Sequence, residues 1–140
     1  MLNTVGAILD GIVPDQIVTK WIVRINAGKW IGGTGGIDTV EQLARVKSVV
    51  VESVMPGGYA ILNADDDLVF KMKEGLSCHV ALFSSDPKSK RIKEHCDKNG
   101  IAAVYDESSD MIYIQKGAWK IQIQKAHQIP LTQGGKALFN

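Results

Sequence analysis

A lysine interrupts the apolar face of a segment that has helical spacing. In DTVEQLARVKSVVVESV, residues 38–54, apolar side chains recur at intervals of three and four and form one seam: Val40, Leu43, Lys47, Val50 and Val54. Lys47 is the only charged residue of that seam. An inward-facing lysine suits chemistry in which the amine must first lose its proton, because removal from water disfavours the charged form. Alternatively, Lys47 runs along the apolar surface and places its amine in water.

Other residue groups that could do chemistry carry weaker signals. The glycine-rich loop NAGKWIGGTGG, residues 26–36, lacks the GK[ST] ending of a phosphate-binding Walker loop and the GxGxxG spacing of a dinucleotide fold. Three consecutive carboxylates, Asp65, Asp66 and Asp67, point in different directions and are expected to cap the following helix rather than bind a metal ion.

The histidines and cysteines do not form a recognisable catalytic or metal-binding pattern. We expect structural or exposed roles for all three histidines, His79, His95 and His127. Cys78 and Cys96 lack zinc-site spacing and are expected to be reduced and partly buried.

Composition limits the class of protein. The 140 residues are 45% hydrophobic and 22% charged, which predicts one soluble globular domain. A formal net charge of +1 gives no electrostatic footprint for nucleic acid, and no apolar run approaches the roughly 20 residues of a membrane span. We therefore expect a cytoplasmic protein without nucleic acid or membrane partners.

Strands and helices alternate through the middle of the chain. A helix begins after Asp38 or Thr39, with Glu41 or Gln42 completing a capping box, and MPGG at 55–58 ends it. The following elements are a strand (59–62), a brief helix through residue 73, a strand (78–84), a helix (89–100) and a strand (101–105). This order predicts an α/β fold with a short, mostly parallel sheet and flanking helices.

The pattern changes after residue 105. MIYIQK and WKIQIQKA are joined by Gly117-Ala118, and Ile121 and Ile123 alternate with glutamines, which predicts an antiparallel β-hairpin with its isoleucines facing inward. The pattern divides the chain into an uncertain start (1–36), an α/β part (37–105) and a hairpin and tail (106–140).

Two stretches resemble a known enzyme family. IDTVEQLARVKSVVVESVMPGGYAILNADDD and IPLTQGGKALF look like segments of the Mur-ligase-like part of the cyanophycin synthetases, and the likeness runs from about residue 37 to 139. The resemblance implies the second half of a central domain in an enzyme that uses ATP and magnesium to join amino acids to a carboxylate. It implies that Lys47, if carbamylated, acts as a catalytic residue that helps position magnesium. It also implies that Asn63 binds the adenine edge, since an amide offers both a donor and an acceptor.

The sequence departs from the family pattern in the glycine-rich loop. Asn26, Gly33 and Gly35 match that pattern, but Trp30 and Ile31 stand where the family has an Asp-His pair, which puts metal support in doubt. No Walker loop is present. We therefore expect a fragment of an ATP-dependent amide ligase that binds no cofactor tightly alone and needs a separate ATP-binding half or the rest of a longer chain. It could also assemble into an oligomer. The alternative is a non-catalytic relic or a nucleotide- or protein-binding module that keeps the fold.

Overall fold

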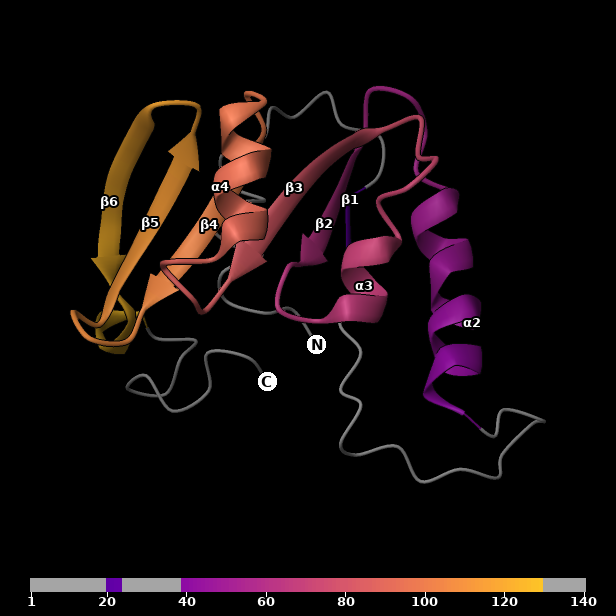
Figure 1. Cartoon of the computed structure of the whole chain (residues 1–140), viewed down its shortest axis with the longest axis horizontal. Coiled ribbons are helices and arrows are strands. Elements are labelled where there is room, and N and C mark those ends of the chain that lie inside the picture. Colours follow the sequence, from indigo (N-terminus) through magenta and orange to yellow (C-terminus); the bar gives the residue numbers. More distant parts are fainter. Residues whose placement is uncertain (1–19, 24–38, 130–140) are drawn as a thin grey trace.

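A mixed β-sheet with helices packed on one face forms the framework of the protein (Figure 1). A computed structural model describes residues 20–23 and 39–129. The elements in these ranges are β1 (Lys20–Val23), α2 (Val40–Glu52), β2 (Tyr59–Asn63), α3 (Asp67–Lys71), β3 (His79–Ser84), α4 (Lys90–Asp97), β4 (Ile101–Asp106), β5 (Met111–Lys116), β6 (Trp119–Lys125) and the short 3-10 helix η2 (Ala126–Gln128).

The strand order confirms the expected α/β class. The six described strands lie in the sheet in the order β1-β2-β3-β4-β5-β6, with parallel pairing from β1 to β4 and antiparallel pairing from β4 to β6. The hairpin therefore extends the parallel sheet. The sequence pattern did not indicate β1, which pairs in parallel with β2. Expectations for the glycine-rich loop, including Asn26, Trp30 and Ile31, and for the tail from residue 130 onward lie outside the described residues.

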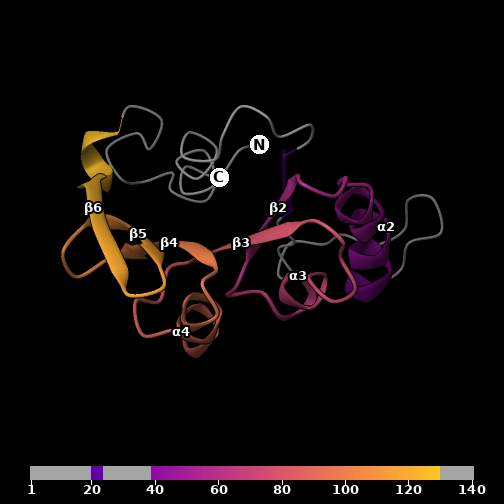
Figure 2. The ribbon, with the colours of Figure 1, turned by 90° about the horizontal axis from the view of Figure 1, so that it is seen from above.

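Two apolar clusters sandwich the middle of the sheet. Figure 2 shows α2, α3 and α4 on the same side of the strands. The cluster beneath these helices includes Leu62, Leu82 and Val104, and the opposite face carries a second cluster around Ile61 and Phe83. Because successive strand residues point to opposite faces, the near-continuous apolar runs of β2, β3 and β4 supply both clusters. Among the described residues, no helix has the length and apolar character needed to cross a membrane.

The inward orientation expected for the isoleucines of β6 is wrong. Every residue of β6 is exposed, with Ile121 at 51% and Ile123 at 41%. Ile121 stands opposite Ile114, on the sheet face away from the described helices, and β6 has only β5 as a neighbour in the described sheet. A register shift also occurs between Ile112 and Tyr113. Ile112 pairs with Gln124 and Tyr113 pairs with Gln122, so Ile123 has no partner in the register and the alternation of inward and outward side chains is interrupted there.

The end of α4 depends on two residues with different roles. The Asn99 N–H donates to the Cys96 carbonyl at 2.8 Å, and the Gly100 N–H donates to the His95 carbonyl at 2.9 Å, which is a Schellman motif. Asn99, with φ of 64°, takes the left-handed conformation in that motif. Gly100 is needed for another reason, since a Cβ there would overlap the ring of His95.

We expect Gly100→Ala to destabilise the protein by about 1–3 kcal/mol, the usual cost of overpacking. To make room, the half-buried His95 ring would have to shift, and a shift would disturb the contact of its Nε2 with the Ile101 carbonyl oxygen at 3.2 Å. Urea unfolding of the two proteins measures the change. The control Asn99→Gly should change stability by less than about 0.5 kcal/mol, since residue 99 is already left-handed. Equal stability of Gly100→Ala and the parent would contradict the crowding at this position.

Candidate functional site

Lys47 lies on the inward side of α2. Thr39 caps this helix, and Gln42 completes the capping box with two reciprocal hydrogen bonds of 3.1 Å. Ala44, Val51 and Val54 are buried, and Lys47, which lies between Ala44 and Val51 on that side, is partly buried. The expected seam is wrong at Val50, which is 37% exposed, because the helix turns Val51 rather than Val50 toward the core.

Asn63 is the last residue of β2 and lies at the edge where the parallel strands end. Its side chain is buried, with 9% exposure. Oδ1 accepts a hydrogen bond from the Asp65 backbone N–H at 3.0 Å, and within the described ranges Nδ2 donates to no group. A buried amide hydrogen without an acceptor costs free energy, so such a group is a natural contact for a ligand. Ligands of open α/β sheets bind at this edge.

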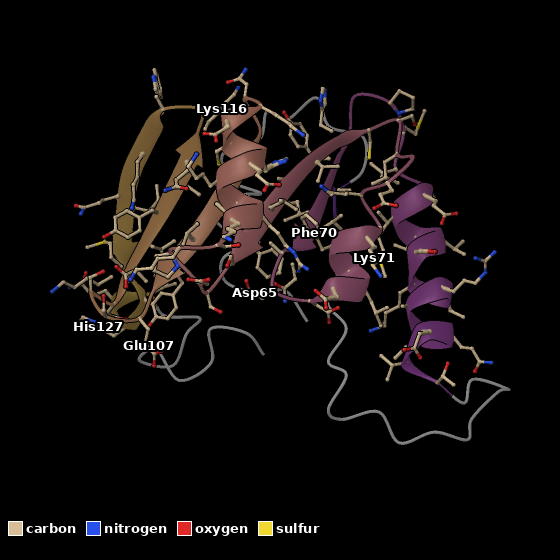
Figure 3. The ribbon with its side chains drawn as sticks, viewed as in Figure 1. Asp65, Phe70, Lys71, Glu107, Lys116 and His127 are labelled. Carbon is tan, nitrogen blue, oxygen red and sulfur yellow. The ribbon has the colours of Figure 1, made fainter. Side chains whose placement is uncertain are left out.

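The end of β3 holds the turn that follows Asn63. The Ala64 N–H donates to the Phe83 carbonyl at 2.8 Å, which continues the β2–β3 pairing by one residue. The Asp65 carboxylate then accepts hydrogen bonds from the Ser84 hydroxyl and from the Ser85 N–H, the latter at 2.7 Å. Figure 3 shows Asp65 in this place, beside the start of α3. Its carboxylate therefore joins the ends of two strands.

The other two carboxylates of the NADDD turn have separate partners. Asp66 caps α3 by accepting from the Leu68 and Val69 N–H groups at 2.9 and 3.1 Å. Asp67 forms an ion pair with Arg91 of α4. Asp66 therefore caps α3 as expected, whereas Asp65 and Asp67 bond to the end of β3 and to α4 instead. Within the described residues, no group of three or more histidine, cysteine or acidic side chains could hold a metal ion.

The turn carries an amide that can pair with adenine, but the sequence has no loop of the kind that binds a triphosphate. Nδ2 of the buried residue Asn63 can donate to the acceptor on the Watson–Crick edge of adenine, and Oδ1 keeps a second lone pair for the amino group. The sequence carries no GxxxxGK[ST] loop whose N–H groups and lysine would hold the phosphates. The Asn63 amide thus has groups that can pair with adenine, and the sequence has no Walker loop for the phosphates of ATP.

Lys47 and Asn63 lie on different elements, α2 and β2, which both contact α3. Lys47 is in the middle of α2, which packs beside β1 and α3, and Asn63 leads from β2 into α3. Figure 1 shows α2 beginning beyond the edge where β2 and β3 end, with α3 between them, and running in the direction opposite to these strands. Because helical side chains lean toward the N-terminus of their helix, a mid-helix lysine leans toward that same edge.

A histidine–carboxylate contact that was not anticipated lies at the same edge of the sheet, after the carboxyl end of β4 and on the far side of β3 from Asn63. His127 of η2 contacts the Asp110 carboxylate through Nδ1, and the Tyr105 hydroxyl donates to the same carboxylate at 3.2 Å. The group ties η2 to the turn between β4 and β5. A separation of 17 residues between His127 and Asp110 hides the pair from motif reading. The cysteines match expectation, since Cys78 and Cys96 are both free, the first half-buried and the second buried.

The Asp67–Arg91 pair should be visible in a pH titration. The hydrogen bond and charge of Arg91 lower the pKa of Asp67 below its ordinary value of 3.8. The pair therefore contributes fully above the unfolded-state pKa of about 3.9 and is lost as pH falls through the folded value. NMR titration of the Asp67 carboxyl carbon should show Arg91→Met raising its pKa toward 3.8. Asp106 is the control, because serine hydrogen bonds lower its pKa. An unchanged Asp67 pKa in the variant would exclude the pair.

Comparison with curated proteins finds similarity to cyanophycin synthetases. The chain is 50% identical to the cyanophycin synthetase of Trichormus variabilis over 107 aligned residues. These residues make up 76% of this chain and 12% of that protein. The chain is 49% identical to the Synechocystis enzyme over the same number of residues. Identity to the Crocosphaera subtropica enzyme is 46% over 134 residues, or 96% of this chain and 15% of that protein. No protein-family model matches. The chain is thus similar to a segment of cyanophycin synthetase that spans about an eighth of those relatives.

Proposed function

We propose that the chain is the adenine-side part of an ATP-dependent amide-bond-forming ligase of the cyanophycin synthetase kind. The observation that carries this proposal is the buried side chain of Asn63, whose Nδ2 donates to no group within the described residues at the carboxyl end of β2. The similarity to cyanophycin synthetases over 76–96% of the chain supports the enzyme class.

The chemistry of such an enzyme needs more than this segment contains. ATP, when bound with magnesium, would supply the phosphoryl group that activates a carboxylate. Positioning and charge neutralisation dominate phosphoryl transfer, and the turn around Asn63 contributes only orientation of the base. The partner in this proposal is either a separate ATP-binding half or the rest of a longer chain, as the length of the relatives suggests. The part described here would hold adenine while the partner holds the phosphates.

We assign Lys47 a role near the metal, conditional on its carbamylation. Its partly buried position on the inward side of α2 supports this, because a carbamate at the end of a lysine would replace an ammonium by an oxygen ligand for magnesium. If the Lys47 side chain leans toward the N-terminal end of α2, the carbamate points toward the edge of the sheet where β2 and β3 end.

We expect the chain alone to show no ligase turnover and at most weak, adenine-dependent affinity for ATP. Adenine contacts do not neutralise a triphosphate, so magnesium should add little. Calorimetry with ATP, with and without magnesium, measures both points, and Asn63→Leu should abolish the residual binding. The control is Gln122→Leu, which removes an exposed side-chain amide from β6. Micromolar, magnesium-dependent binding would show that the phosphates have a site here. Binding unaffected by Asn63→Leu would refute the adenine assignment.

Replacing Lys47 by Met tests whether this amine serves stability. Methionine is similar in length to the lysine stem that lies between Ala44 and Val51. We therefore expect the free energy of unfolding either to increase or to decrease by less than about 1 kcal/mol. Arg45→Met on the exposed side of the same helix is the control for changed net charge. Chemical denaturation compares the three proteins. A loss on the order of 3 kcal/mol, the scale for breaking a buried ion pair, would assign Lys47 to structure and remove it from the catalytic proposal.

A further inference from the structure

Arg91 makes three contacts with the segment that follows Asn63. Its Nη1 donates to the Ala64 carbonyl at 2.8 Å, and its other terminal nitrogen pairs with the Asp67 carboxylate. Its Cζ also lies 4.5 Å from the centroid of the Phe70 ring. The three groups belong to one stretch of seven residues, although Arg91 lies 24 and 27 positions after Asp67 and Ala64. Arg91 thus joins α4 to the turn between β2 and α3.

These contacts use the shape of the guanidinium as well as its charge. Two separate nitrogens serve two acceptors, and the planar group lies over an aromatic ring. A lysine ammonium is a single point on a flexible stem and cannot reproduce this arrangement. Side-chain exposure of Arg91 is 37%, against 76% for Lys93 two positions later, so Arg91 is the more confined of the two. The site therefore selects arginine by geometry.

The peptide unit between Ala64 and Asp65 links Arg91 to Asn63. Its carbonyl oxygen accepts from Arg91, and its N–H donates to Oδ1 of Asn63 at 3.0 Å. A trans peptide is planar, and its C=O and N–H point in opposite directions. When Arg91 fixes the carbonyl, it also fixes the direction of the N–H and with it the amide plane of Asn63. Nδ2 of Asn63 then faces away from that N–H.

We propose that Arg91 is a positioning residue that sets the orientation of the Asn63 amide through the Ala64–Asp65 peptide and so determines selectivity for adenine. The proposal rests on the adenine role assigned to Asn63 above. Adenine presents an amino donor and a ring acceptor on the edge that an amide reads, whereas hypoxanthine presents the reverse. An amide held in one orientation separates the two bases, and an amide free to turn over does not.

The experiment compares the full chain with Arg91→Met and Arg91→Lys, using Lys93→Met as the matched control on the same helix. Lys93 pairs with Asp97 at 2.6 Å in an exposed ion pair that is separate from the turn. Two readouts are needed. Hydrogen exchange of the Asp65 amide without nucleotide reports the peptide, and the shifts of the Asn63 side-chain amide during titration with adenosine or inosine report affinity and selectivity.

We expect the parent to prefer adenosine over inosine and Arg91→Met to weaken adenosine binding about tenfold, the effect of losing one good polar interaction. The preference should approach one in Arg91→Met, and exchange of the Asp65 amide should accelerate. Arg91→Lys should restore only part of both losses, and Lys93→Met should match the parent. A role limited to stability would lower the melting temperature without changing the ratio of the two affinities.

Different results overturn different claims. Unchanged Asp65 exchange and an unchanged adenosine-to-inosine ratio in Arg91→Met would refute the positioning role. Full restoration by Arg91→Lys would also refute it, because charge alone would then suffice. If neither nucleoside shifts the parent's Asn63 amide while Asp65 exchange still accelerates in Arg91→Met, the peptide link stands, and both the adenine role and the selectivity that rests on it fail.

Discussion

Burial of the central strands on both faces is the constraint on which the rest of the structure depends. Leu62 and Leu82 face the helices, and Ile61 and Phe83 face the other way, all fully buried. Backbone groups leaving such strands have little access to water, so they need partners close by. In the turn after β2, these groups form hydrogen bonds to the end of β3 and to α4. Asn63 is buried beside this turn, and among the residues in the described ranges its Nδ2 has no acceptor.

Local chemistry made the elements from α2 to β6 predictable, but not β1. The capping box at Thr39 and Gln42 and the apolar runs of β2, β3 and β4 gave the order of strands and helices, because each signal lies within a few residues. The exposure of β6 was not predictable in this way. Alternation along a strand marks two faces, but whether another element covers one of them depends on strand position in the sheet and on a local register shift.

The candidate site was predictable only in part. The resemblance pointed to Asn63 and Lys47, and the structure puts Asn63 at the ligand edge of the sheet and Lys47 on the inward side of α2. The contacts of Arg91 were not predicted from the sequence, because its basic neighbours in SKRIK indicate only a solvated helix face. Its partners lie more than 20 positions earlier, and only the fold brings them together. Long-range polar contacts of this kind leave no periodic trace in a single sequence.

The central claim is that the Asn63 amide reads adenine at the carboxyl end of β2. The most direct measurement is the set of intermolecular nuclear Overhauser effects between adenosine and the isotope-labelled chain. The account predicts contacts from the adenine protons to the Asn63 side-chain amide and to neighbouring residues of the turn before α3. Contacts confined to another surface, such as the groove between α4 and the β5–β6 turn lined by Lys93, Gln115 and Lys120, would contradict it.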